Sequence, residues 1–180
     1  MHKPLLSIAL FFLVVVSFAQ KFSPNEAESK VSFVIKNFGL KVDGNFKGIR
    51  GTILFDPADL YNSAVYVSVS ANTIDTDNST RDKHLKKADY FNVEKFPIIS
   101  FISTKISKTA TVGKYIISGN LTIKGTTKQI EFDFTAIPIN TGFTFKGAFT
   151  INRRDFNVGG SSLALSDNLT VYLNVASIKN

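Results

Sequence analysis

The chain has 180 residues, of which 44% are hydrophobic and 19% are charged, and its formal net charge is +7. This length suits one domain, and the composition excludes a disordered chain. There is no Cys, which excludes disulfides, thiolate chemistry and cysteine metal sites. Phe is unusually frequent, with 17 copies against no Trp and one Met, so the apolar side chains are stiff and aromatic.

The first residues have the layout of a secretory signal peptide. Lys3 precedes a nearly unbroken apolar run at residues 5–18, and Ala19 is a small residue suited to a cleavage site. The run is shorter than the roughly 18 residues of a membrane-spanning helix, although a retained anchor is the alternative. We therefore predict a signal peptide at residues 1–19, one domain at residues 20–180, and export to the periplasm or the cell exterior.

Alternation of apolar and polar residues with period two recurs along the rest of the chain and predicts about eight β-strands. Most connections are short and carry turn residues, so consecutive strands are expected to pair antiparallel. The apolar faces of the predicted strands are marked, in chain order, by Val31, Phe33 and Ile35; by Val42, Phe46, Ile53 and Phe55 on one strand broken near Gly48; by Val65, Val67 and Val69; by Ile99 and Phe101; by Tyr115, Ile117, Leu121 and Ile123; by Ile130, Phe132 and Phe134; by Phe143, Phe145, Phe149 and Ile151; and by Leu169, Val171, Leu173 and Val175.

Two connections are longer than the others. Residues 73–97 are expected to contain a short helix capped by Ser79 or Thr80, and Pro97 sets the start of the next strand. Residues 152–167 contain a glycine pair and a serine pair, which are typical of a mobile loop. Insertions of this length in a compact all-β domain usually act as lids, binding loops or plugs.

Eight antiparallel strands can close into a barrel or stack as a sandwich. Closure removes free strand edges, and an eight-stranded barrel is about the size whose interior holds one small ligand. Long strands such as the one predicted at 113–124 favour a tall barrel. Alternating Phe and Ile also fit a filled core, so periodicity alone leaves both a ligand cavity and a solid interior open.

Four segments carry a family resemblance: SFVIKNFGLKVDGNFKGIRGTILFDP, ANTIDTDNSTRDKHLKKADYFNVEKFP, GNLTIKGTTK and FTINRRDFNV. In this order, and over about residues 22–177, they resemble the YceI-like family of exported polyisoprenoid-binding proteins. The resemblance implies an all-β fold, an eight-stranded antiparallel lipocalin-like barrel with a short helix in the insertion between strands 3 and 4. It also implies an interior that takes the isoprenoid tail of a quinone or polyprenyl lipid. The family usually has Gly where this chain has Asn157, a residue type that tolerates left-handed backbone.

The resemblance turns the inward apolar residues into a candidate lipid-binding set. Aromatic and β-branched side chains suit this role, because they offer contact area with little rotamer entropy to lose. About half of the set is expected to touch a ligand, since side chains fill the closed end of a barrel. The candidates are Phe33, Ile35, Phe46, Ile53, Phe55, Val67, Phe101, Ile117, Leu121, Phe132, Phe134, Phe145 and Phe149.

A polar head group would lie at the mouth of the barrel. The candidates for contact with it are Arg81, Asp82 and His84 on the long insertion, and Arg153, Arg154 and Asp155 near the last loop. The alternative roles are structural. Arg153 and Asp155 would form an ion pair that holds the loop, and Arg81 and Asp82 would stabilise the start of the helix. Three neighbouring lysines are candidates for transient contact with a membrane surface or form a solvated face, namely Lys83, Lys86 and Lys87.

The predicted function is non-enzymatic binding, carriage or storage of an isoprenoid or similar amphiphilic lipid outside the cytoplasm. We expect no metal, no cofactor apart from a bound isoprenoid or quinone-like ligand, and no nucleic acid; a homodimer stays open. The competing prediction is a stress-response or structural barrel with a filled core. An enzyme would need a base with an orienting partner, and His84 has no legible Ser or carboxylate partner. Nucleic-acid binding is disfavoured despite a pI of about 9.6, because the basic residues are dispersed.

Overall fold

The computed structural model describes residues 20–180, and the signal peptide predicted at residues 1–19 lies outside this range. One α-helix, α1 (Ser79–Leu85), and three short 3-10 helices, η1 (Glu26–Glu28), η2 (Ala71–Thr73) and η3 (Arg153–Phe156), interrupt the strands. No helix within the described range is long and apolar enough to span a membrane. The ten strands are β1 (Gln20–Pro24), β2 (Lys30–Asn37), β3 (Leu40–Phe46), β4 (Arg50–Phe55), β5 (Ala64–Ser70), β6 (Ile98–Lys108), β7 (Lys114–Ile123), β8 (Thr126–Ile139), β9 (Gly142–Asn152) and β10 (Leu165–Lys179).

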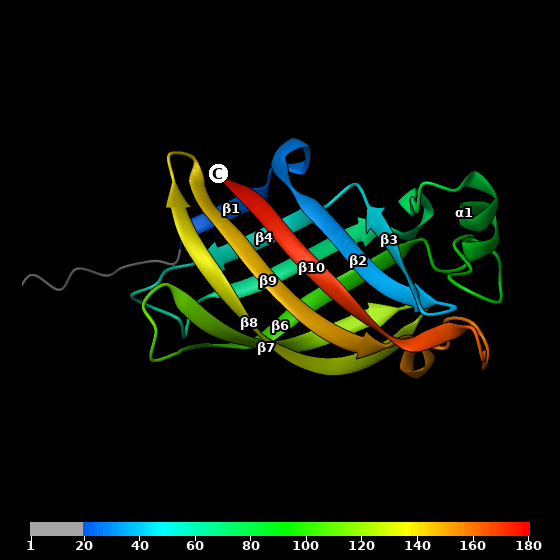
Figure 1. Cartoon of the computed structure of the whole chain (residues 1–180). Coiled ribbons are helices and arrows are strands. Elements are labelled where there is room, and N and C mark those ends of the chain that lie inside the picture. The colour runs from blue at the N-terminus through cyan, green and yellow to red at the C-terminus, as the bar shows by residue number, and fades with distance from the viewer. Residues whose placement is uncertain (1–19) are drawn as a thin grey trace, which may run out of the picture.

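Eight of these strands close into an antiparallel barrel (Figure 1). Their order around the barrel is β1-β4-β5-β6-β7-β8-β9-β10, and β1 closes the ring because Phe22 and Pro24 stand opposite Lys179 and Ser177 of β10. The prediction of an eight-stranded antiparallel barrel with a short helix in the long insertion is therefore confirmed.

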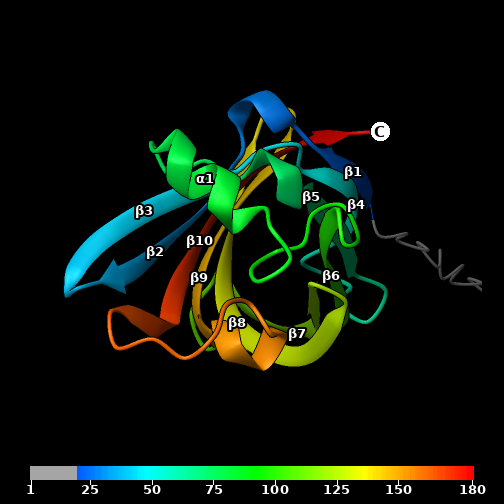
Figure 2. The same cartoon turned by 90° about the vertical axis from the view of Figure 1, so that its right-hand side faces the viewer.

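The two remaining strands, β2 and β3, form a hairpin that extends one end of the barrel wall. Strand β10 changes partner along its length: its last residues pair with β1, and residues 165–174 pair with β2. Figure 2 looks onto this end, where β2 and β3 stand away from the ring formed by the other strands.

The break predicted near Gly48 is present, but the prediction that residues on both sides of it form one continuing strand is wrong. Gly48, with a φ of 75°, breaks it into β3 and β4, which lie far apart in the strand order. The short strand β1 was not predicted, since its sequence QKFSP shows no clear alternation.

The insertion between β5 and β6 places α1 over the same end of the barrel (Figure 1). The helix cap is Asn78, whose Oδ1 accepts a hydrogen bond from the backbone N–H of Arg81 at 3.0 Å. The predicted caps, Ser79 and Thr80, are wrong by one or two residues, because Asn caps a helix at least as well as Ser or Thr. A β-bridge between Asn45 and Asp75 ties the start of the insertion to β3.

Aromatic side chains fill the opposite end of the barrel. Phe55 is 1% exposed, and its ring centroid lies 5.3 to 5.4 Å from those of Tyr115, Phe143 and Phe145 in edge-to-face geometry. Phe22 packs edge-to-face on Phe143 at 5.6 Å. Such aromatic pairs add stability beyond the area that they bury. This end of the barrel is therefore closed by the protein's own side chains.

Candidate ligand-binding cavity

A cavity of about 460 Å³ occupies the barrel between the aromatic plug and α1. This volume lies within the range of roughly 300 to 1,000 Å³ that small-molecule sites show. All thirteen residues of the candidate lipid-binding set lie on its wall: Phe33, Ile35, Phe46, Ile53, Phe55, Val67, Phe101, Ile117, Leu121, Phe132, Phe134, Phe145 and Phe149. Strand alternation explains this result, because inward positions recur at every second residue.

The thirteen residues divide by exposure. Six are buried, namely Phe33, Ile53, Phe55, Ile117, Leu121 and Phe134. The other seven are only partly buried. Two of these, Phe132 and Phe149, stack on one another with centroids 4.5 Å apart and an interplanar angle of 27°. Aromatic faces thus form part of the wall that a ligand would meet.

Three glycines on the inner face leave room for aromatic rings beside the strands. Gly44 stands opposite Phe33 in the ladder between β2 and β3, and a Cβ on Gly44 would lie 2.6 Å from Cε1 of the Phe33 ring. A Cβ on Gly119 would lie 2.5 Å from Cζ of Phe101, and both distances are shorter than real Cβ contacts. A Cβ on Gly147 would lie 3.2 Å from Cε2 of Phe132, which is a looser contact of the same kind. The absent side chains let these rings lie against the wall and keep the interior open.

The cavity reaches the end of the barrel that carries α1, and we call this end the mouth. Three elements bound it: the β2–β3 hairpin, helix α1, and the loop between η3 and β10 (Figure 2). Among the lining residues that lie on or next to these elements are Asn37, Val42, Arg81, His84, Leu85, Ser162 and, at the start of β10, Leu165. The mouth is therefore the more polar end of an otherwise apolar cavity.

The first predicted head-group cluster lies at the mouth, but only part of it lines the cavity. Arg81 donates from Nε to Oγ1 of Thr76 at 2.7 Å and from Nη2 to the Thr76 carbonyl at 2.6 Å. The carboxylate of Asp82 accepts hydrogen bonds from the same threonine, from Oγ1 at 2.5 Å and from the backbone N–H at 3.0 Å. Arg81 and Asp82 thus hold the turn before the helix through a shared partner, and Asp82 does not line the cavity.

His84 also lines the cavity from helix α1. Its ring packs edge-to-face against Tyr90 with centroids 5.0 Å apart. Within residues 20–180, no group of three or more His, Asp or Glu residues could hold a metal ion. The polar residues that line this end of the cavity are Asn37, Thr76, Arg81, His84, Arg153 and Ser162.

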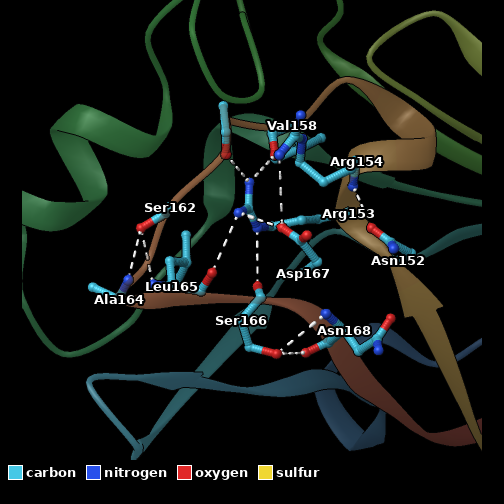
Figure 3. A network of polar contacts seen from close by, with 11 residues as sticks. Asn152, Arg153, Arg154, Val158, Ser162, Ala164, Leu165, Ser166, Asp167 and Asn168 are labelled. Carbon is cyan, nitrogen blue, oxygen red and sulfur yellow. Dashed lines mark hydrogen bonds and ion pairs between the residues drawn. The ribbon is translucent and has the colours of Figure 1, made fainter.

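Of the second predicted cluster, only Arg153 lines the cavity. Arg153 is 4% exposed, and its guanidinium donates five hydrogen bonds that hold the loop before β10 (Figure 3). The acceptors are the carbonyls of Ser166, Val158, Gly160 and Leu165 and the carboxylate of Asp167. Buried charge is tolerated when it is paired and fully hydrogen-bonded in this way.

The expected pair between Arg153 and Asp155 is therefore wrong. The acid that meets Arg153 is Asp167, at 2.8 Å, at the start of β10. Asp155 and Arg154 are exposed on η3 and do not line the cavity, although Arg154 lies 3.9 Å from Asp167. Arg154 and Asp155 face outward from η3, whereas Arg153 is buried and meets the loop that folds back over η3.

The loop is also joined to the insertion. The N–H of Gly159 donates to the Asp89 carbonyl at 2.9 Å. The ammonium of Lys124 donates to the carbonyls of Asn157 at 2.7 Å and Asp89 at 3.2 Å. Burial lowers the pKa of Lys124, and the charge of Asp89 partly offsets this effect. Asn157 has φ 56° and ψ 30°, so the left-handed turn expected at this departure from the family pattern is confirmed.

Sequence reasoning missed several residues of the wall. Tyr90 and Phe91 come from the insertion, and Phe91 packs edge-to-face on Phe46 at 5.6 Å. An aromatic pair inside an otherwise polar insertion is the signal that could have found them. Val171 and Leu173 also line the cavity, and their strand alternation matched that of the chosen residues.

The sequence is similar to known proteins over most of its length. The family model that describes a YceI-like domain matches residues 22–177. A UPF0312 protein of Pectobacterium atrosepticum is 34% identical over 147 residues, which are 77% of this chain and 74% of that protein.

Solved structures share the fold. BcnA of Burkholderia cenocepacia has a TM-score of 0.80 and 26% identity, over 84% of this chain and 98% of that one. The YceI protein of Campylobacter jejuni has a TM-score of 0.69 and 31% identity, over 77% and 86% of the two chains. A polyisoprenoid binding domain from Saccharophagus degradans has a TM-score of 0.73 over 91% and 100% of the two chains, and at 14% identity this likeness concerns the fold alone.

Proposed function

Because the chain belongs to the YceI-like family, we propose that it binds and carries an isoprenoid or similar long-chain amphiphilic lipid in its barrel cavity, without catalysis. The observation that carries this proposal is an apolar cavity of about 460 Å³ that is closed at one end and polar at the other. A lipid tail gains about 0.8 kcal/mol per CH₂ removed from water, so it would leave the protein only for another apolar environment. Exchange with a bilayer is then close to balance and needs no chemical energy source.

The polarity of the cavity fits one orientation of such a ligand. The tail would point toward the plug around Phe55, and the head group would lie near Arg81 and His84. The Nη1 group of Arg81 makes no hydrogen bond within residues 20–180, so it is available to a polar head group. The donors of Arg153 are already used by the loop, which favours the helix side of the mouth.

We further propose that the protein acts outside the cytoplasm after removal of residues 1–19. Cleavage after Ala19 would leave Gln20, which stands opposite Phe55 in the ladder between β1 and β4, as the first residue. The cut would therefore fall where the barrel begins. The mass of the exported protein tests this directly, since a chain that retains residues 1–19 would contradict it.

Native mass spectrometry of freshly purified protein tests lipid binding. We expect a discrete added mass on the wild type, and its absence from a Phe132→Asp, Phe145→Asp double variant, whose charges would lie in the cavity. The matched control is Ile102→Asp, Ile137→Asp, which places the same charges at exposed positions on β6 and β8. Circular dichroism establishes that each variant is folded. A folded cavity variant that retains the same lipid, or a wild type that carries none, would refute the proposal and favour a barrel without a lipid ligand.

A further inference from the structure

Three large apolar side chains are exposed at the mouth of the cavity. Phe38 is 82% exposed and Leu40 is 73% exposed, and both lie at the tip of the β2–β3 hairpin. Leu163, in the loop before β10, is fully exposed. We call these three residues the apolar rim. Single exposed apolar residues are ordinary, but a group of three beside a ligand cavity is a candidate contact surface.

The backbone fixes the two parts of the apolar rim beside one another. Asn37 of the hairpin stands opposite Leu165, and the N–H of Phe38 donates to the carbonyl of Ala164 at 2.8 Å. Both Asn37 and Leu165 line the cavity, so the apolar rim adjoins the mouth directly. Figure 1 shows the hairpin and this loop at the same end of the molecule as α1.

The hairpin tip carries a local cost that the fold does not explain. Phe38 and Gly39 form its two-residue loop, with φ values of 49° and 77°. Such a loop favours Asn, Asp or Gly at its first position, and a residue with a Cβ pays on the order of 1 kcal/mol there. Phe is thus strained in its backbone and exposed in its side chain. Contact between the Phe38 side chain and a partner outside the chain accounts for both the strain and the exposure.

The lysines around the apolar rim favour an anionic partner. Lys36 stands opposite Lys41 at the base of the hairpin loop, and two like charges in this position repel. Both are exposed, and neither forms an ion pair within the described part of the chain. Lys83 and Lys87 on and after α1 add two more exposed cations at this end. Each lysine near an anionic bilayer contributes about 1 kcal/mol of attraction.

We infer that the apolar rim docks on an anionic lipid bilayer and inserts its three side chains below the head groups, with the flanking lysines at the head-group level. This inference rests on the proposed function, because a protein that carries bilayer lipids can exchange them more readily when the mouth of its cavity faces the bilayer directly. Interfacial insertion reaches roughly 5 to 10 Å into the bilayer, which suits a hairpin tip. The tail could then pass between bilayer and cavity with little exposure to water.

The absence of Trp from the sequence allows a direct test. Phe38→Trp introduces a single indole at the tip, and Tyr61→Trp introduces one at an exposed apolar position in the β4–β5 connection, at the closed end of the barrel. With vesicles of phosphatidylglycerol and phosphatidylcholine, we expect a blue shift for Phe38→Trp and quenching by brominated acyl chains. Tyr61→Trp should change little. An indole at position 38 that stays unshifted, or equal quenching of both variants, would overturn the inference.

Vesicle flotation supplies the loss-of-function arm. We expect Phe38→Ser, Leu40→Ser, Leu163→Ser to bind anionic vesicles at least tenfold more weakly than the wild type, whereas Tyr61→Ser, Val112→Ser should bind like the wild type. Native mass spectrometry of the same samples reports lipid retention independently: a triple variant that keeps its lipid and loses vesicle binding supports docking. Equal flotation of all variants overturns docking while leaving the proposed function intact. A dimer that the triple variant disrupts, without any vesicle binding by the wild type, would assign the apolar rim to a second copy and overturn it as well.

Discussion

The Phe33 ring occupies the space beside Gly44, its partner across the β2–β3 ladder, where any Cβ would collide with it. The pair shows how a barrel wall can carry a large aromatic side chain without losing its interior. The ring takes up volume that the neighbouring strand would otherwise fill. The position of the Phe33 ring therefore depends on the absence of a side chain at Gly44.

Gly44→Ala should displace the Phe33 ring toward the cavity. Because the cavity offers room, we expect a stability cost of only about 1 kcal/mol, at the low end for overpacking, together with a several-fold lower lipid-bound fraction. Thermal denaturation and native mass spectrometry measure the two effects. Gly160→Ala is the control, since a Cβ there meets no atom within 4 Å. Adding Phe33→Leu to Gly44→Ala should restore binding, and unchanged occupancy in the single variant would contradict this account of the wall.

Arg153→Met should destabilise the protein by about 3 kcal/mol, because it removes a buried charge from its ion pair and leaves the buried Val158 carbonyl and three part-buried carbonyls of the loop without this donor. Urea denaturation measures the free energy of unfolding. Arg154→Met is a matched control on the adjacent residue, whose exposed ion pair with Asp167 should be worth less than about 1 kcal/mol. Equal losses for the two variants would show that the buried network does not stabilise the loop as described.

Asn157→Ala should cost about 1 kcal/mol more than Asn157→Gly, because only Ala pays for the left-handed backbone at this position. Both variants lose the hydrogen bond from Nδ2 to Oγ1 of Thr126, so their difference isolates the backbone effect. Differential scanning calorimetry of the two variants gives the comparison. Equal melting temperatures would mean that the turn relaxes when its side chain is removed.

Lys124 should make the stability of the wild type rise with pH in the alkaline range. Its pKa in the folded state lies below 10.5, chiefly through burial, so between that pKa and 10.5 the unfolded chain binds more protons than the folded one. The free energy of unfolding attributable to Lys124 therefore increases as pH rises through this window. Subtracting the pH profile of Lys124→Met isolates the contribution, and a difference that is flat or falls with pH would reverse the sign argued here.

The sequence predicts the wall of the cavity well because period-two alternation is a local property. Phe132 and Phe134 must share a face of β8 whatever the strand pairs with. The closing strand β1 could not be predicted in this way, since five residues without alternation become a strand only through pairing with β4 and β10. The place of β1 in the barrel depends on contacts between residues far apart in the sequence.

The same distinction explains the errors at the polar positions. The sequence places Arg153 near Asp155, but burial selects the partner, and the loop that returns over η3 brings Asp167 to the guanidinium. Thr76 is another case, because its role between Arg81 and Asp82 depends on a turn that no spacing rule describes. Residue type suggested polar function at the mouth, and tertiary structure decided which side chains face inward.

Because β10 changes partner along its length, the β2–β3 hairpin at the mouth of the cavity lies outside the ring of eight strands. The β2–β3 hairpin pairs with β10 through β2, and within residues 20–180 the outer edge of β3 pairs with no further named strand. The insertion meets this edge through the bridge between Asn45 and Asp75, an ion pair between Lys47 and Asp75, and hydrogen bonds between Lys47 and Thr73. The bridge between Asn45 and Asp75 consists of two backbone hydrogen bonds, of 2.9 and 3.1 Å. Because β2 and β3 lie outside the ring, a displacement of this hairpin at the mouth would leave every pairing among the eight ring strands intact.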